Sequence, residues 1–83
     1  MSSMYLVTYD LRLPGQAYQN LWNVLDRMGA RRALESAWVV RSESDAPAIR
    51  EFLKRYIDQN DRLLVTGMNG WASFNTMTNI TQV

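Results

Sequence analysis

The stretch from Met4 to Leu11 places the strongest constraint on how this chain folds. Its residues up to Asp10 are β-branched, aromatic and aliphatic, a composition typical of a buried strand. By alternation, the two faces of such a strand carry Tyr5, Val7 and Tyr9 on one side and Leu6, Thr8 and Asp10 on the other. Because both faces are largely apolar, we expect an inner strand that is covered on both sides.

A chain of 83 residues allows one small domain, with a core over residues 4–68 and a C-terminal extension over residues 69–83. A domain of this size buries only about 60–65% of the surface that the unfolded chain exposes, so its stability is marginal without help. The sequence has no cysteine or histidine, which excludes disulfides, the usual zinc sites and nucleophiles activated by histidine. Oligomerisation is the remaining source of stability, and acid–base or metal chemistry must use Asp, Glu, Lys, Tyr or water.

The charge and hydropathy of the chain exclude few functions. The formal net charge is +1, and every basic residue except Lys54 is an arginine, which suits bidentate contacts with phosphate or carboxylate. A dedicated nucleic-acid binder usually has a larger excess of positive charge. No run reaches the roughly 18 apolar residues of a membrane span, and the N-terminus lacks the pattern of a signal peptide. We therefore expect a cytoplasmic protein with no membrane partner.

Two amphipathic helices are indicated by an apolar period near 3.6 residues. The first follows a turn at Pro14-Gly15, runs from Gln16 and ends at Gly29 as its C-terminal cap. The second is capped by Ser44 or Asp45, with Pro47 in its first turn. The apolar stripes are Ala17, Leu21, Val24, Leu25 and Met28 in the first helix, and Ala46, Ile49, Leu53, Tyr56 and Ile57 in the second.

Two further β regions flank the second helix. Residues 30–42 alternate as one long strand or, with a bend or hairpin near Glu35-Ser36, as two short strands, which is the interpretation we prefer. Residues 62–67 form the last strand, after a turn at residues 58–61. The order β-α-β-β-α-β predicts an α+β, ferredoxin-like sandwich with one antiparallel sheet, two helices on one face, and the first and third strands inside.

The second face of the predicted sheet has no helix to cover it. If Tyr5 and Tyr9 pack under the helices, Leu6, Thr8 and Asp10 line this open face. An exposed apolar face on a small protein usually marks an interface, and the simplest cover is a second copy related by a two-fold axis. We therefore expect a homodimer that forms through the sheet, with an interface at Leu6, Thr8 and Trp71. Residues 71–83 either add a short strand or form a tail that docks on a partner.

Several short motifs resemble the CRISPR-associated Cas-two proteins and the VapD-like toxins that share their plan. The motifs are Tyr9-Asp10 at the end of the first strand, Gly29 at the end of the first helix, and the segment from Leu34 to Val40. Asn60-Asp61 before an apolar strand and Gly70-Trp71 are similar to small bacterial and phage-borne Cas-two-like proteins of unassigned role. The resemblance covers roughly residues 4–68, in order and in spacing.

The resemblance implies a ferredoxin-like homodimer in which the aspartate that ends the first strand, Asp10 here, binds a divalent metal near the dimer axis. It implies phosphodiester hydrolysis for some relatives and a non-catalytic scaffold for others. Ser36 matches the serine of the family's second β region. Many family nucleases have further polar residues after this aspartate, where this chain has residues 11–15. Family nucleases also often have a more basic surface than this chain. Both differences weigh against cleavage.

The candidate catalytic residues are Asp10 and Ser36. Two copies of Asp10 across a two-fold axis would hold one Mg²⁺ or Mn²⁺, which lowers the pKa of a bound water and shields a phosphate. Alternatively, Asp10 caps the turn after its strand. Ser36 either contacts a phosphate or satisfies backbone groups at the bend. Asp61 is either a second acidic ligand near Asp10 or a turn residue.

Arg12, Arg31 and Arg32 are the candidate nucleic-acid contacts, which would bind phosphate without regard to base sequence. The alternative for these arginines is solvated charge or pairing with Glu35 and Asp26. If they gather on one surface of the dimer, they form a phosphate-binding patch beside the candidate metal site.

Together these patterns predict a homodimer that engages RNA or DNA, as a metal-dependent endonuclease that uses paired Asp10. The alternative is a non-enzymatic dimeric scaffold or protein-interaction module of the same fold, whose open surface binds a protein partner. Trp22 and Trp38 are expected in core or dimer packing, because the aromatic pattern of ferredoxin-like RNA binders is absent. Trp71 is a candidate anchor across the dimer.

Overall fold

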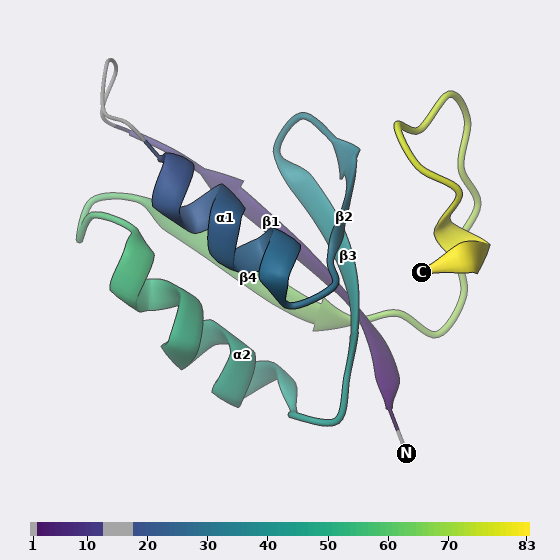
Figure 1. Cartoon of the computed structure of the whole chain (residues 1–83), viewed down its shortest axis with the longest axis horizontal. Coiled ribbons are helices and arrows are strands. Elements are labelled where there is room, and N and C mark those ends of the chain that lie inside the picture. The colour runs from purple at the N-terminus through teal and green to yellow at the C-terminus, as the bar shows by residue number, and fades with distance from the viewer. Residues whose placement is uncertain (1, 13–17) are drawn as a thin grey trace.

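The computed structural model describes residues 2–12 and 18–83 (Figure 1). The elements in chain order are β1 (Ser3–Asp10), α1 (Gln19–Arg27), β2 (Arg31–Leu34), β3 (Ala37–Ser42), α2 (Ala46–Leu53), the 3-10 helix η1 (Lys54–Tyr56), β4 (Arg62–Gly67) and the 3-10 helix η2 (Ile80–Gln82). The predicted turn at Pro14-Gly15 and the predicted helical residues Gln16 and Ala17 lie outside the described residues. In the part of the chain that is described, no helix has the length and apolarity needed to cross a membrane.

The four strands form one antiparallel sheet in the order β2-β3-β1-β4. β1 and β3 are therefore the inner strands, as the sequence predicted. Both helices pack on the same face, because the buried side chains of α1 and α2 belong to one core cluster. This small α+β architecture is compatible with a ferredoxin-like fold.

Gly29 terminates the first helix, as predicted: α1 ends at Arg27, and Gly29 follows its C-cap residue Met28. The N–H of Gly29 donates to the carbonyl of Asp26, and the N–H of Ala30 donates to the carbonyl of Leu25, each at 3.0 Å. Gly29 has φ of +84°, a left-handed conformation that glycine adopts without a steric penalty from Cβ. This cap turns the chain directly into β2.

The predicted division of residues 30–42 into two short strands is confirmed. β2 and β3 pair as an antiparallel hairpin around Glu35-Ser36. The second helix then begins as predicted: the Asp45 carboxylate accepts a hydrogen bond from the Ala48 N–H at 3.0 Å, and Pro47 lies in the first turn, where its missing N–H costs nothing.

The main core lies between the helices and the sheet. Tyr5, Val7 and Tyr9 face the helices, as expected from the alternation in β1, and they pack in a cluster with residues of both helices and of β3. Its largest fully buried side chains are Leu21, Leu25, Leu53, Val7 and Val40. Burial of such side chains is the main favourable contribution to folding in a domain of this size.

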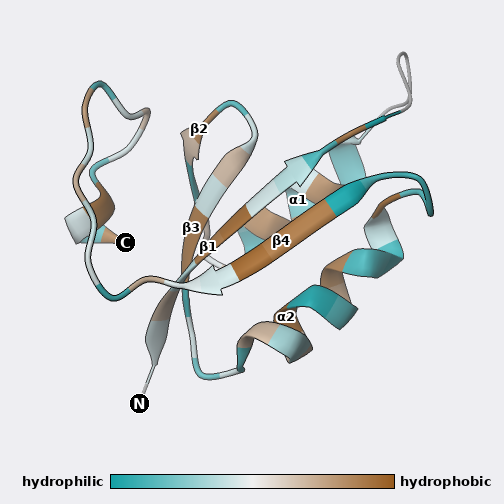
Figure 2. Cartoon of the chain, turned by 180° about the vertical axis from the view of Figure 1, so that it is seen from behind, coloured by the Kyte–Doolittle hydropathy of each residue, from teal (hydrophilic) through white to brown (hydrophobic). Residues whose placement is uncertain are grey.

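The opposite face of the sheet carries a second, smaller cluster that includes the C-terminal extension, residues 69–83. Ile80 of η2 packs with Met4, Ala33 and Val39. The extension runs alongside β2 (Figures 1 and 2), where the Met77 N–H donates to the Ala33 carbonyl at 2.9 Å. The extension is irregular apart from η2 and adds no strand to the sheet. It docks instead on the sheet of its own chain.

The extension leaves half of this face open. In Figure 2, which looks at the sheet from the side opposite the helices, no described segment lies in front of β1 and β4. Leu64 of β4 is 57% exposed there. The open face expected from the sequence is therefore confined to the β1–β4 side of the sheet.

Candidate nucleic-acid interface

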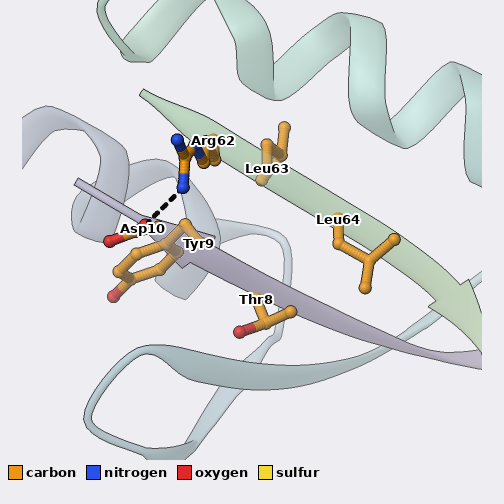
Figure 3. A pocket seen from close by; sticks show the side chains of 6 residues that line it. All are labelled: Thr8, Tyr9, Asp10, Arg62, Leu63 and Leu64. Carbon is orange, nitrogen blue, oxygen red and sulfur yellow. Dashed lines mark hydrogen bonds and ion pairs between the residues drawn. The ribbon is translucent and has the colours of Figure 1, made fainter. Parts of the chain in front are cut away.

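The end of β1 brings one carboxylate and two guanidinium groups together. Asp10 pairs in the sheet with Arg62, the first residue of β4. The Oδ2 atom of Asp10 lies 3.5 Å from Nη1 of Arg62 (Figure 3) and 3.5 Å from Nη1 of Arg12. The side chains of Asp10, Arg12 and Arg62 are 58%, 47% and 71% exposed. Such solvated ion pairs contribute little to stability, so both guanidinium groups remain accessible to another anion.

A shallow hollow of about 210 Å³ lies beside this charged group. Asp10 and Arg62 form its polar end, and Thr8 and Leu64 continue it along the open face of the sheet (Figure 3). The Thr8 hydroxyl donates to the Ser36 carbonyl at 3.0 Å. The hollow therefore combines a charged end, which suits a phosphate, with an apolar wall.

Ser36 lies at the same end of the sheet as Asp10. Its carbonyl accepts from the Tyr9 N–H at 3.1 Å as well as from Thr8, which fixes the turn between β2 and β3 against β1. The backbone of Ser36 thus satisfies groups at the bend, which is one of the two roles expected from the sequence. The residue is exposed, so its hydroxyl remains a candidate phosphate contact.

Arg31 does not join Arg12 and Asp10. In the sheet it lies opposite Val39, which in turn pairs with Leu6, several residues before the end of β1. Nη1 of Arg31 lies 3.9 Å from Oδ1 of Asp26. The structure therefore places Arg31 in the pairing with Asp26 that the sequence offered as the alternative to phosphate binding.

Arg32 lies on the helix side of the sheet, between two tryptophans. Its Cζ atom is 5.0 Å from the ring centroid of Trp22 and 4.9 Å from that of Trp38. Both distances suit a cation–π interaction, which is stronger where the cation is partly desolvated. Its Nε is buried without a hydrogen-bond partner among the described residues. Within one chain, Arg32 therefore faces the helices and does not join Arg12 beside Asp10.

The Tyr9 hydroxyl holds this stack together, a role that the sequence analysis missed. It accepts from Nε1 of Trp22 at 3.0 Å, from Nε1 of Trp38 at 3.1 Å and from Nη2 of Arg32 at 3.3 Å. A hydroxyl oxygen has two lone pairs, which is consistent with two shorter bonds and one longer bond. The only sequence signal was the position of Tyr9 on the face that carries the tryptophans.

Asp61 lies near the end of β1, as the antiparallel arrangement predicted, but its oxygens are occupied. Oδ1 accepts from the Arg12 N–H at 2.7 Å and from the Tyr18 hydroxyl at 2.9 Å, and Oδ2 accepts from the Asp58 N–H at 2.7 Å. Partial burial raises the pKa of this carboxyl, but the three hydrogen bonds outweigh that effect and hold its pKa below the usual value. These are the contacts of a turn residue.

A single chain does not assemble a set of ligands for a divalent cation from the residues described. No three acidic side chains come together there, Asp61 is engaged by backbone and tyrosine donors, and Asp10 faces two arginines. Mg²⁺ and Mn²⁺ prefer several oxygen ligands. Among the described residues at this end of the sheet, one chain therefore offers the Asp10 carboxylate as the acidic ligand of such a cation.

The predicted interface residues lie in different surroundings. Leu6 is half-buried and packs against the cluster that contains Ile80. Thr8 lines the open hollow. Trp71 is 43% exposed and, with Leu6, lines a second cavity of about 370 Å³ under the extension.

No family model matches the chain, and no solved structure matches it. The resemblance to Cas-two proteins therefore stays a prediction from the short motifs.

Replacing Tyr9 by phenylalanine tests the hydrogen bonds at the centre of the stack. We expect Tyr9→Phe to lower the free energy of unfolding by about 2–3 kcal/mol, because buried indole N–H groups lose their acceptor. Urea unfolding followed by circular dichroism measures the change. Tyr5→Phe is the matched control, since no hydrogen bond to the Tyr5 hydroxyl is present among the described residues; it should change stability by less than about 0.5 kcal/mol. Equal stabilities of the two variants would contradict this role for Tyr9.

The lowered pKa of Asp61 makes stability depend on pH in a defined direction. Because the pKa is lower in the folded state, the ionised carboxylate stabilises the fold above the unfolded pKa of about 3.9, and this contribution is lost as the pH falls through the folded pKa. Asp61→Asn should therefore lower the free energy of unfolding by about 1–3 kcal/mol at neutral pH and by less in acid. Unfolding measured from pH 7 down to pH 2 gives the comparison. If the difference in free energy of unfolding between the wild type and Asp61→Asn stayed constant with pH, the lowered pKa of Asp61 would be refuted.

Proposed function

We propose that this protein binds the phosphate backbone of RNA or DNA as a homodimer, through Arg12 and Arg62 beside Asp10. The observation that supports the proposal is the triad itself: two guanidinium groups, each 3.5 Å from one exposed carboxylate, at the end of the sheet. Two cations and one anion leave a net charge of about +1, which a phosphodiester neutralises. Arginine donates two parallel hydrogen bonds to phosphate oxygens, so the contact is independent of base sequence.

The dimer is proposed from the apolar side chains that the single chain leaves exposed. Leu64 on the open face is 57% exposed, and Phe74 of the extension is 86% exposed. Leu34 and Met77 are exposed by 54% and 63%. A small domain gains stability by covering such groups, and a two-fold axis lets one patch cover its own copy. Thr8 and Trp71 lie beside these residues and belong to the same proposed interface.

Phosphodiester hydrolysis is proposed as the activity of a dimer that brings the two Asp10 carboxylates together. The pair would then hold Mg²⁺ or Mn²⁺, which supplies Lewis-acid stabilisation of the negative charge that develops on a phosphate. Arg12 and Arg62 would bind the phosphate, and Ser36 would contact it from the turn between β2 and β3.

A non-enzymatic scaffold is the second candidate, and one observation favours it. The arginines on either side of Asp10 neutralise the carboxylate that a cation would need. In that case the same surface binds nucleic acid without cleaving it, or the open face binds a protein partner.

Sedimentation tests the dimer. We expect the wild-type chain to sediment as a dimer at micromolar concentration. Leu64→Lys should weaken association by about ten-fold or more, because a charge would be buried without a partner. Asn20→Lys, on the exposed side of α1, adds the same charge away from the open face and should leave the dimer unchanged. A wild-type protein that stays monomeric at tens of micromolar would refute the dimer.

Binding and cleavage are tested with labelled RNA and duplex DNA, in Mg²⁺, Mn²⁺ or chelator. Arg12→Gln and Arg62→Gln should each weaken binding several-fold at low salt and reduce the slope of affinity against salt by about one. Arg27→Gln removes the same charge from an exposed position on helix α1 and should have little effect on binding. Asp10→Asn should abolish metal-dependent cleavage while binding persists.

The outcomes separate the candidates. Cleavage that survives Asp10→Asn would remove Asp10 from the catalytic role. Salt-sensitive binding without cleavage would establish the scaffold, and the absence of both would refute the nucleic-acid proposal.

A further inference from the structure

The C-terminal extension and the outer face of the sheet enclose a cavity of about 370 Å³. Leu6, Ala33 and Ala37 contribute to its wall on the sheet, and Trp71 and Phe74 contribute to its wall on the extension. Both alanines are buried, yet a methyl group is too short to fill the space beneath the extension. Close-packed interiors leave few voids larger than a water molecule, whereas ligand sites have volumes of about 300–1,000 Å³. The cavity therefore has the size of a ligand site.

The lining of this cavity favours an uncharged ligand. None of the described residues that line it is charged. Arg31 and Arg41 lie on the same face of the sheet but outside the cavity. Nη1 of Arg31 lies 3.9 Å from Oδ1 of Asp26, and Nε of Arg41 donates to the Val83 carbonyl at 3.0 Å. A charged ligand would lose its hydration in the cavity without gaining a partner of opposite charge.

Three of the lining side chains favour an aromatic ligand. Trp71 and Phe74 are 43% and 86% exposed, so much of each ring remains in contact with water in the single chain. Met68 adds a thioether to the same wall. Aromatic rings pack well on other rings, and a thioether sulfur makes favourable contacts with ring edges. A ring held in the cavity would therefore cover side chains that the extension leaves solvated.

The hydroxyl of Thr76 gives the cavity a hydrogen-bond acceptor. It donates to the Thr78 carbonyl at 2.8 Å, which leaves the lone pairs of its oxygen for a donor. Asn75, the preceding residue, has φ of +57°, a left-handed conformation that asparagine tolerates better than most residues do. The residues on either side of it, Phe74 and Thr76, both line the cavity. The extension thus presents an acceptor next to an aromatic side chain.

We propose that the cavity under the extension binds an uncharged aromatic molecule that has one N–H or O–H donor. An apolar cavity of roughly 150 Å³ holds a benzene molecule, so about 370 Å³ accommodates about two or three rings. The rings pack between Ala37 and the aromatic side chains of the extension, and the donor bonds to Thr76. The cavity shares no lining residue with the hollow beside Asp10, and the proposal does not depend on nucleic-acid binding.

The test uses the full chain and N-phenylnaphthylamine, an uncharged aromatic amine with one N–H donor whose fluorescence rises when it leaves water. We expect saturable binding at one site. Anilinonaphthalene sulfonate has the same rings and an added sulfonate, so it is the matched control for charge. It should bind about ten-fold more weakly, because the cavity offers the sulfonate no cation.

Variants of the lining test the position of the probe. Ala37→Leu should weaken binding of the amine by about ten-fold, because the longer side chain occupies the cavity. Trp71→Ala, on the exposed extension, should weaken binding by a similar factor without disturbing the core, and Trp71→Phe should retain most of the affinity. Leu64→Lys, on the open part of the sheet outside the cavity, should bind the amine as the wild type does.

Nuclear magnetic resonance locates the probe, because the signals of Ala33 and Trp71 should shift on binding and those of Trp22 should not. Three results would overturn the proposal: no saturable binding, tighter binding of the sulfonate, or unchanged binding in both Ala37→Leu and Trp71→Ala. Loss of binding in Leu64→Lys, or as the protein concentration rises, would assign the cavity to an interface between copies and overturn it as well.

Discussion

β1 is hydrogen-bonded along both edges and carries apolar side chains on both faces, and the other elements take their places from it. Its odd-numbered residues bond to β3 and its even-numbered residues bond to β4. Val7 and Tyr9 face the two helices, while Met4 and Leu6 face the C-terminal extension. A strand with these properties is stable only inside a sheet, so its composition determines where its neighbours lie.

Much of the fold could be predicted from local patterns, because those patterns are strong in this chain. Alternation indicated the inner strand, a period near 3.6 indicated the helices, and the cap residues Gly29 and Asp45 located their ends. The extension had no such period. Its position depends on contacts between distant residues, such as Met77 with Ala33 and Ile80 with Val39, which no local pattern encodes.

The candidate site was predicted less completely. The antiparallel arrangement correctly placed Asp61 near the end of β1, and the structure brings Arg62 and Ser36 there as well. Arg31 and Arg32 were grouped with Arg12 because the loop after the first strand and the start of the second were expected on one surface of the dimer, yet neighbouring residues of a strand point to opposite faces. Arg32 accordingly enters the aromatic stack and Arg31 does not. The role of the Tyr9 hydroxyl could not be predicted, because it depends on two indoles from different elements meeting at one atom.

The arrangement of the three tryptophans gives the protein two separate optical probes. Trp22 and Trp38 are held against one guanidinium and one phenol oxygen inside the main core, whereas Trp71 lies half-exposed on the extension. Fluorescence from Trp22 and Trp38 reports on the packed interior. Fluorescence from Trp71 lies at longer wavelength, because its indole is more solvated, and reports on the extension. Release of the extension would therefore change the emission of Trp71 and leave that of Trp22 and Trp38 unchanged.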